Sequence, residues 1–340
     1  IEENIVNNLI EILENKIGKL SNKKIVIFTS EKGHERFKHW IDSLLEKYEE
    51  LSLIYIDDNS YDIAVELAKK ITIEDYDIVI GLGGGRILDT SKYVSYISKK
   101  TYIAIPTTLS NDGLTSPIAV LKTHEGRSKS FGCKSPDGLI ADINIFKNSP
   151  KNLVIAGIGD TVSNYTSLYD WKLESKHKNI PLNDFAYLLS DVASNLLLGS
   201  REEDISSPVF LKQLVESIVL SGLAMDIAGS SRPCSGSEHL FSHSLDEHYN
   251  LNLQHGIQVA LGSIVSCIFQ GRSYEPIISF LKRYKVDVYP MSYGITKEIF
   301  VGAWMKAKAT RPERFSILDT FELTEEYLIE VYDKIEEITR

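Results

Sequence analysis

The sequence predicts an α/β N-terminal domain with a parallel sheet over residues 1–150, followed by an all-α C-terminal domain over 151–340. Short runs rich in Ile and Val alternate with amphipathic helical patterns in the first part of the chain. The strand pattern fades after about residue 150, and long helical patterns replace it. The polar segment FKNSPKN (146–152), which contains Pro150, marks the expected junction.

Five short apolar runs are the expected strands of the first domain: 23–29, 51–57, 77–83, 101–106 and 118–122. Runs of this kind, with little polar alternation, are typical of strands covered on both faces, as in a Rossmann-like parallel sheet. Segments 35–50 and 61–71 space their apolar residues three and four apart and are the expected crossover helices. The expected helices of the second domain are 161–176, 184–199, 207–229, 255–271 and 325–338.

Composition and charge exclude several classes of partner. The 340 residues are 43% hydrophobic and carry a net charge of −10, which opposes binding to nucleic acid or to an anionic membrane surface. The sequence has no run of eighteen apolar residues, so no membrane insertion is expected. The cysteines Cys133, Cys234 and Cys267 are odd in number and widely spaced, which argues against a disulfide framework. We therefore expect a cytoplasmic protein that acts on small molecules.

A glycine-rich turn follows the third expected strand. Gly83, Gly84 and Gly85 lie where that strand ends and a helix begins, so backbone N–H groups can approach an anion such as a pyrophosphate. Arg86 stands where the dinucleotide fingerprint has its third glycine, and no Walker sequence follows. A tight turn without a ligand is the alternative.

Two further polar segments follow expected strands. Asp57 can accept hydrogen bonds from an adenosine ribose and favours NAD over NADP, unless it is only a solvated strand end. The loop at 105–117 offers hydroxyl and carboxylate groups to a cofactor, although a surface turn has the same composition.

Four of the eight histidines lie between residues 235 and 256. His239 and His243 share one face of an expected helix, and His255 opens the next one. The intervening loop, 249–254, is short enough to make the two helices an antiparallel pair. A divalent metal needs neutral imidazoles and a carboxylate, and Asp160 is the candidate carboxylate. Asp160 can alternatively be a helix N-cap.

Five segments, taken in order, carry a family resemblance: GGGRILDTSK, PTTLSNDGLTSP, GIGDTVSNYTSLYDW, SSRPCSGSEHLFSH and QHGIQVALG. Together they resemble glycerol-1-phosphate dehydrogenases, within the superfamily of glycerol dehydrogenases, iron-containing alcohol dehydrogenases and dehydroquinate synthases. The resemblance spans about residues 20–310. It implies a dehydroquinate synthase-like fold and a place in phospholipid metabolism. Members form dimers and larger assemblies, so a homo-oligomer is compatible with it.

The resemblance assigns roles to particular residues. Asp160, His239 and His255 would bind the metal, which is zinc in this branch, with nickel and iron as alternatives. Iron-dependent relatives have a histidine where this chain has Asn164. The residues that would face NAD or NADP are Gly83, Gly84, Gly85, Asp89, Thr107, Thr108 and Ser110, with Lys92 supporting the turn. Asp112 would lie near the nicotinamide and the substrate, and Ser231, Arg232 and Ser237 would bind a substrate phosphate.

The expected reaction is the reversible reduction of dihydroxyacetone phosphate to sn-glycerol 1-phosphate, with His243 as the proton relay. Three alternatives remain open at this point. A glycerol dehydrogenase would oxidise glycerol to dihydroxyacetone, and a dehydroquinate-synthase-like lyase would use NAD without net turnover. A metabolite-binding scaffold would lack catalysis altogether. The alternative for Arg232 is a surface ion pair in an acidic protein.

Overall fold

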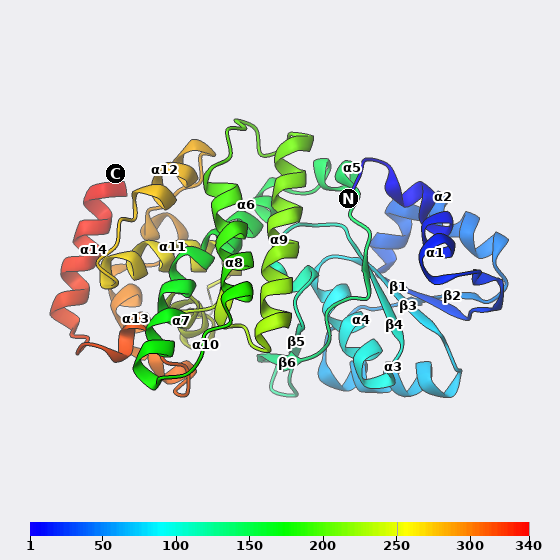
Figure 1. Ribbon diagram of the computed structural model, residues 1–340, viewed down its shortest axis with the longest axis horizontal. Helices are drawn as coiled ribbons and strands as arrows, with labels where there is room; N and C mark the ends of the chain where they lie inside the picture. The colour runs from blue at the N-terminus through cyan, green and yellow to red at the C-terminus, as the bar shows by residue number, and fades with distance from the viewer. Residues whose placement is uncertain (250, 340) are drawn as a thin grey trace. The chain divides into compact units, whose positions relative to one another are not determined.

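The computed structural model describes residues 1–249 and 251–339, and it divides into two compact units. One unit comprises residues 1–109 and 113–150, and the other comprises 110–112 and 151–340. Figure 1 follows the chain from the strands of the first unit to the helices of the second.

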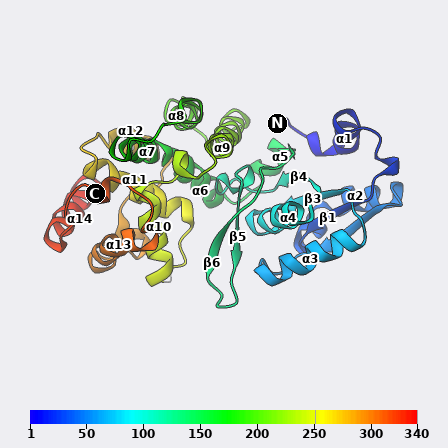
Figure 2. The same cartoon turned by 60° about the horizontal axis from the view of Figure 1, so that its bottom comes forward.

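A five-stranded parallel sheet with the order β2-β1-β3-β4-β7 forms the centre of the first unit. Every residue of the central strands β1 and β3 is buried, as the continuous Ile and Val runs predict. Figure 2 shows α3 and α4 on one side of the sheet and α1 and α5 on the other. The strands are β1 (Ile25–Thr29), β2 (Leu51–Tyr55), β3 (Ile78–Gly83), β4 (Thr101–Pro106) and β7 (Gly138–Leu139).

The helices of this unit connect the strands in the expected alternation. Ser30 and Ser60 begin α2 and α3 by accepting hydrogen bonds from the backbone N–H groups of Gly33 and Ile63. A serine at these positions satisfies a donor that the first helical turn leaves unpaired. The helices are α1 (Leu9–Ile17), α2 (Glu31–Lys47), α3 (Tyr61–Ile73), α4 (Gly85–Ser98) and α5 (Ile143–Lys147).

The expected strand at 118–122 forms, but it is not part of the parallel sheet. As β5 (Ile118–Lys122) it pairs antiparallel with β6 (Ser128–Gly132) in a separate hairpin (Figure 2). Val120 and Lys122 are exposed while Ala119 and Leu121 are buried, so only one face of β5 is covered. That alternation is typical of an antiparallel strand. The sequence-based assignment of this strand to the parallel sheet is therefore wrong.

Among its described residues, the second unit is built from α-helices and short 3-10 turns. Helix α11 is buried along almost its whole length, as expected for a helix that is apolar on all sides. It packs against α6 and α10. The helices are α6 (Lys151–Val162), α7 (Asn164–Lys178), α8 (Asp184–Leu198), α9 (Pro208–Ala228), α10 (Ser237–His248), α11 (His255–Phe269), α12 (Glu275–Arg283), α13 (Lys297–Thr310) and α14 (Glu325–Thr339).

Helix α9 is the one described helix that is long and apolar enough to cross a membrane, judged by length and composition alone. Over half of its most apolar stretch, 56%, is buried inside the protein, and α9 packs against α8. Lys212 and Glu216 interrupt its apolar residues. Core helices of folded proteins have the same composition, so this feature is weak evidence for a membrane span.

Candidate active site

Three side chains from three helices of the second unit converge on one point. Asp160 lies near the end of α6, His239 in the first turn of α10, and His255 at the first residue of α11. Asp160 Oδ1 lies 3.7 Å from His239 Nε2 and 3.6 Å from His255 Nε2. One ligand atom from each residue falls within 4.8 Å of the other two, a spacing at which one metal ion can contact all three. Asp160 is inside α6, so it is not the helix N-cap considered above.

Two glycines allow these helices to approach so closely. A Cβ added at Gly256 would lie 1.8 Å from the backbone oxygen of Ala156, and one at Gly159 would lie 2.0 Å from that of Gly256. Both distances are far below any normal contact, so α6 and α11 pack backbone against backbone here. Because these glycines are the immediate neighbours of Asp160 and His255, their absent side chains place the carboxylate beside the imidazole.

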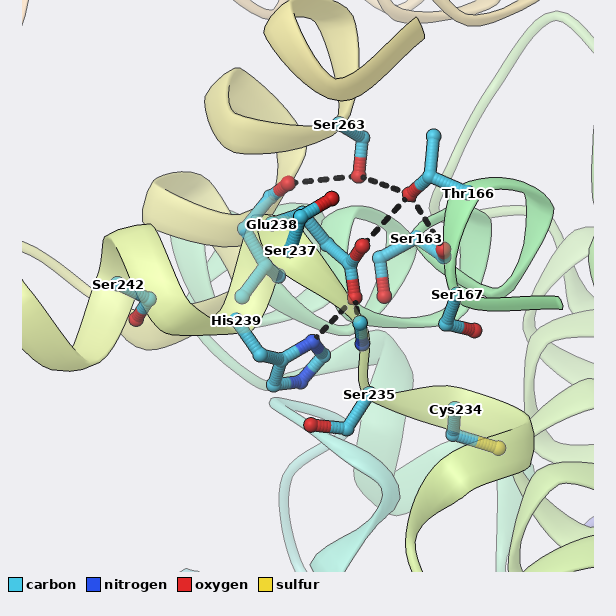
Figure 3. A network of polar contacts seen from close by, with 12 residues as sticks. Ser163, Thr166, Ser167, Cys234, Ser235, Ser237, Glu238, His239, Ser242 and Ser263 are labelled. Atoms are coloured by element: carbon cyan, nitrogen blue, oxygen red, sulfur yellow. Dashed lines mark hydrogen bonds and ion pairs between the residues drawn. The ribbon is translucent and has the colours of Figure 1, made fainter. Parts of the chain in front are cut away.

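A buried carboxylate orients His239. Glu238 is fully buried, and its Oε1 lies 2.8 Å from His239 Nδ1 (Figure 3). Nδ1–H of His239 donates to the Glu238 carboxylate, so Nε2 is the nitrogen that faces Asp160 and that gives up its proton when a metal binds. Gly236 N–H donates to Oε1 at 2.6 Å, and the Thr166 hydroxyl donates to Oε2 at 2.9 Å. These bonds hold Glu238 in place.

A chain of neutral hydrogen bonds orients His255. The Ser242 hydroxyl donates to Gln258 Oε1 at 2.7 Å, so the contact of 2.9 Å between Ser242 Oγ and His255 Nδ1 requires a donor on the histidine. His255 Nε2 is therefore the free nitrogen, and it faces Asp160. Gln258 is fixed in turn by its donation to Asp246 at 2.8 Å. Both histidines thus present the nitrogen that a metal needs.

Electrostatics distinguish His239 from His243. Burial lowers the pKa of His239, but hydrogen bonds to Asp160 and Glu238 outweigh it and raise the pKa to about 9. Burial and the charge of Arg311 hold the pKa of His243 well below 6.5, so His243 is neutral at pH 7. Burial acts to raise the pKa of Asp160, yet the two histidines lower it overall, and the carboxylate is ionised. His243 lies one turn from His239, with 6.4 Å between ring centroids.

Asp112 joins this cluster from the short segment 110–112, which belongs to the second unit. Its backbone N–H donates to Asp160 Oδ2 at 2.7 Å, so the second oxygen of Asp160 is occupied and Oδ1 is left to face the histidines. Ser110 belongs to the same segment and is half-buried.

The three residues predicted to bind phosphate differ in their burial and in their hydrogen-bond partners. Arg232 is buried, and its guanidinium pairs with Glu174 at 2.7 Å and donates to the Phe315 carbonyl at 2.7 Å. Ser237 is fully buried, with its hydroxyl 2.8 Å from that of Ser266. Ser231 accepts a hydrogen bond of 2.7 Å from Arg314. Phosphate binding by these three residues stays a prediction.

The glycine turn predicted for the dinucleotide connects β3 to α4 in the first unit. A Cβ at Gly83 would lie 2.6 Å from Ile87, so packing of the strand against the helix requires this glycine. At Gly84 the nearest atom would be Thr108 Oγ1 at 3.3 Å, and at Gly85 no atom lies within 4 Å. Gly84 is the N-cap of α4 and has no side chain to cap it, so this helix end can accept an anion.

The other predicted cofactor residues surround that turn or lie further away. Thr107 is buried and donates its N–H to the Gly83 carbonyl at 2.9 Å. Burial raises the pKa of Asp89 to about 6, and Lys92 lies 3.8 Å from it. Lys92 also donates to the Ile118 carbonyl at 2.7 Å and thereby ties α4 to β5. Asp57 is exposed after β2, and its carbonyl accepts a bond of 3.4 Å from Arg86.

Sequence reasoning missed Glu238, Ser242 and Gln258, which orient the metal-facing histidines, and the arginines Arg311 and Arg314. Glu238 and Ser242 are neighbours in sequence of residues that the pattern singled out, at His239 and His243. Their position next to His239 and His243 was the feature of the sequence that could have identified them. Nothing comparable marks the two arginines.

The chain is similar in sequence to known dehydrogenases. A family description of iron-containing alcohol dehydrogenases matches residues 1–150. A glycerol-1-phosphate dehydrogenase [NAD(P)+] of Methanococcus aeolicus is 36% identical over 334 residues, which cover 94% of this chain and 92% of the relative. One from Methanoregula boonei is 38% identical over 271 residues, 78% of this chain and 74% of the relative.

Solved structures show the same fold at lower identity. A probable glycerol dehydrogenase from Sinorhizobium meliloti superposes with a TM-score of 0.76 at 18% identity, covering 100% of this chain and 96% of the other. Glycerol dehydrogenase from Schizosaccharomyces pombe gives 0.72 at 18% identity, covering 100% and 89%. The predicted α/β domain followed by a helical domain, in a dehydroquinate synthase-like fold, is confirmed. On the identity and coverage of its relatives, this chain belongs to the glycerol-1-phosphate dehydrogenase family.

Proposed function

We propose that this chain is a metal-dependent, NAD(P)-linked oxidoreductase that interconverts dihydroxyacetone phosphate and sn-glycerol 1-phosphate. The observation that carries the proposal is the convergence of Asp160 Oδ1, His239 Nε2 and His255 Nε2 in a member of this family. All three are oriented by hydrogen bonds that leave a ligand atom available. Hydrogen-bond partners that orient the ligand side chains in this way are typical of metal sites and are not expected in a chance cluster of polar residues.

The donor set fits a divalent metal, and zinc in particular. Two neutral imidazoles and one carboxylate are a usual protein ligand set for catalytic zinc, with a further position open to substrate. Asn164 donates to Ser221 Oγ at 2.8 Å, so it is engaged in the packing of α7 against α9. A bound divalent metal would supply Lewis acidity toward the C2 oxygen of the substrate.

The remaining chemistry belongs to side chains of the cluster. A neutral His243 has one N–H and one free nitrogen, so it can receive a proton and pass it on without holding the charge. Asp160 stays ionised and fixes both histidines electrostatically. The backbone of Asp112 keeps Asp160 from rotating. Asp112 also brings its own carboxylate close to the reacting centre.

The dinucleotide would be held by the turn at Gly84 and Gly85, where α4 begins without a side-chain cap and leaves room for a pyrophosphate. Asp89, Thr107, Thr108 and Ser110 are proposed to complete that site. The nicotinamide would supply or accept the hydride. Asp57 favours NAD, whereas the neighbouring Arg86 can pair with a 2′-phosphate, so we expect both cofactors to be used.

The test is a nicotinamide absorbance assay on zinc-loaded protein, with dihydroxyacetone phosphate compared with dihydroxyacetone and glycerol. We expect turnover of the phosphorylated substrate to exceed that of the neutral ones, and chiral analysis to identify sn-glycerol 1-phosphate. A preference for glycerol would assign the chain to glycerol oxidation instead. Product formation without net change in nicotinamide absorbance would indicate a lyase.

A further inference from the structure

Two arginines outside the predicted site are brought together by a turn. The sequence Arg311-Pro312-Glu313-Arg314 follows α13, and the N–H of Arg314 donates to the carbonyl of Arg311 at 3.1 Å. A hydrogen bond from the N–H of the fourth residue to the carbonyl of the first is typical of a β-turn, in which the Cα atoms of these two residues lie within roughly 7 Å of each other. Proline is favoured at the second position of such a turn. Two guanidinium groups therefore start from adjacent points of the backbone.

These two guanidinium groups have no carboxylate bound to them. Arg314 donates to Ser231 Oγ at 2.7 Å and to the backbone carbonyl of Ser235, which are both neutral acceptors. The Arg311 guanidinium makes no hydrogen bond or ion pair with any described residue. Arg232 differs in having a carboxylate in direct contact, Glu174 at 2.7 Å, which it shares with Lys178. Two half-buried positive charges that start from one turn, with no hydrogen bond or ion pair to a carboxylate among the described residues, favour an anionic ligand.

The turn lies beside the residues that converge on Asp160. Ser235, which accepts from Arg314, stands next to His239 in Figure 3. Helix α13, which leads into the turn, packs against α10 through Trp304 and Phe241, whose rings stack at 4.7 Å. The charges of both arginines contribute to the lowered pKa of His243, and that of Arg311 also acts on His255. The guanidinium groups are therefore within electrostatic range of the histidine cluster.

We propose that Arg311 and Arg314 form the subsite for the phosphate of a phosphomonoester substrate, and that Arg232 instead has a structural role. This inference rests on the proposed function, because the reacting C2 and the phosphorus are separated by only one carbon and one ester oxygen. A phosphate at the turn can therefore belong to a substrate whose C2 oxygen reaches Asp160 and the histidines. Ser231 Oγ and the Ser235 carbonyl take two of the five N–H donors of Arg314 and leave the remaining ones for the ligand.

The experiment compares R311Q and R314Q with the wild-type protein, all loaded with zinc. Arg201→Gln is the matched control, since it removes the same charge from an exposed residue that has no ion pair in the described structure. The measurements are the KM for dihydroxyacetone phosphate, kcat/KM for dihydroxyacetone, and direct calorimetric binding of inorganic phosphate. Zinc content and circular dichroism identify any variant that fails to fold or to load metal.

We expect R311Q and R314Q each to raise the KM for dihydroxyacetone phosphate at least ~10-fold and to weaken phosphate binding by a similar factor. Zinc content should stay within about 2-fold of wild type, as should every value for Arg201→Gln, and the loss in kcat/KM should be several-fold smaller for dihydroxyacetone than for dihydroxyacetone phosphate. The inference is overturned if the wild-type protein does not bind phosphate, or if both variants bind it as tightly as wild type. Lack of turnover of dihydroxyacetone phosphate by the wild type would instead refute the proposed function, because phosphate binding is measured without catalysis.

Discussion

A methyl group added at Gly256 or Gly159 should force α6 and α11 apart and weaken metal binding. In Gly256→Ala the new methyl group would lie 1.8 Å from the Ala156 carbonyl oxygen, and in Gly159→Ala 2.0 Å from the Gly256 oxygen. Real Cβ contacts essentially never fall below 3.0 Å, so the helices must separate by at least 1.2 Å and 1.0 Å respectively. Neither contact can be relieved by rotating a side chain, because the opposing atom belongs to the backbone.

This displacement is large compared with the tolerance of a metal site. Zinc–nitrogen and zinc–oxygen distances lie near 2.0–2.2 Å, and a working site keeps them within about 0.2 Å. Moving Asp160 away from His255 by 1 Å or more therefore loses one ligand. We expect zinc affinity to fall at least ~10-fold, and the free energy of unfolding of the metal-free protein to fall by about 1–3 kcal/mol from overpacking.

The assays are zinc competition with a chromophoric chelator and urea unfolding in the presence of EDTA. Gly132→Ala serves as the control, because a Cβ there has no atom within 4 Å. If Gly256→Ala and Gly159→Ala bound zinc as tightly as the wild type, the argument that close helix packing builds the site would be refuted.

Three further predictions follow from the same structure. Glu238→Ala should weaken zinc binding about 10–100-fold, because it removes the hydrogen bond that orients His239. Ser244→Ala is the control, since it removes a buried hydroxyl without a partner from the same helix and should leave zinc affinity unchanged. Equal losses of zinc affinity in both variants would contradict the orienting role of Glu238. Because the pKa of His239 is about 9 without metal, zinc binding at pH 7 should release about one proton, and zinc affinity should rise as pH rises toward 9. Calorimetry in buffers of different ionisation enthalpy measures the proton release, and finding none would contradict the raised pKa of His239. Burial raises the folded-state pKa of Asp89 from 3.8 to about 6, so its contribution to stability is fully present well below pH 4 and is lost as pH rises through 6. The shift of about 2.2 pH units at about 1.36 kcal/mol each gives about 3 kcal/mol in all, of which urea unfolding at pH 4 and pH 7 should show the wild type losing roughly 2–2.5 kcal/mol relative to D89N.

Local patterns in the sequence predicted much of the fold. Continuous Ile and Val runs identified the strands from β1 to β4, since a strand covered on both faces needs apolar residues at every position. The same logic failed at β5, because a run of five residues does not reveal which strand it will pair with. Pairing depends on β6, whose SKSFG sequence carries little strand signal of its own.

The candidate site was predictable where it depends on spacing along one helix and not where it depends on packing. His239 and His243 are four residues apart, so a helix alone places them one turn apart. The approach of Asp160 to His255 depends on two glycines that permit helix contact, and glycine occurs for many other reasons. Arg311 and Arg314 depend on a turn whose position is set by the end of α13, far along the chain from the histidines.

A crystal structure of the zinc-soaked protein, with anomalous scattering recorded at the zinc edge, tests the central claim most directly. We predict one strong anomalous peak about 2.0–2.2 Å from Asp160 Oδ1, His239 Nε2 and His255 Nε2. A peak bound to other residues, or full zinc occupancy with any of these three atoms uncoordinated, would contradict the account.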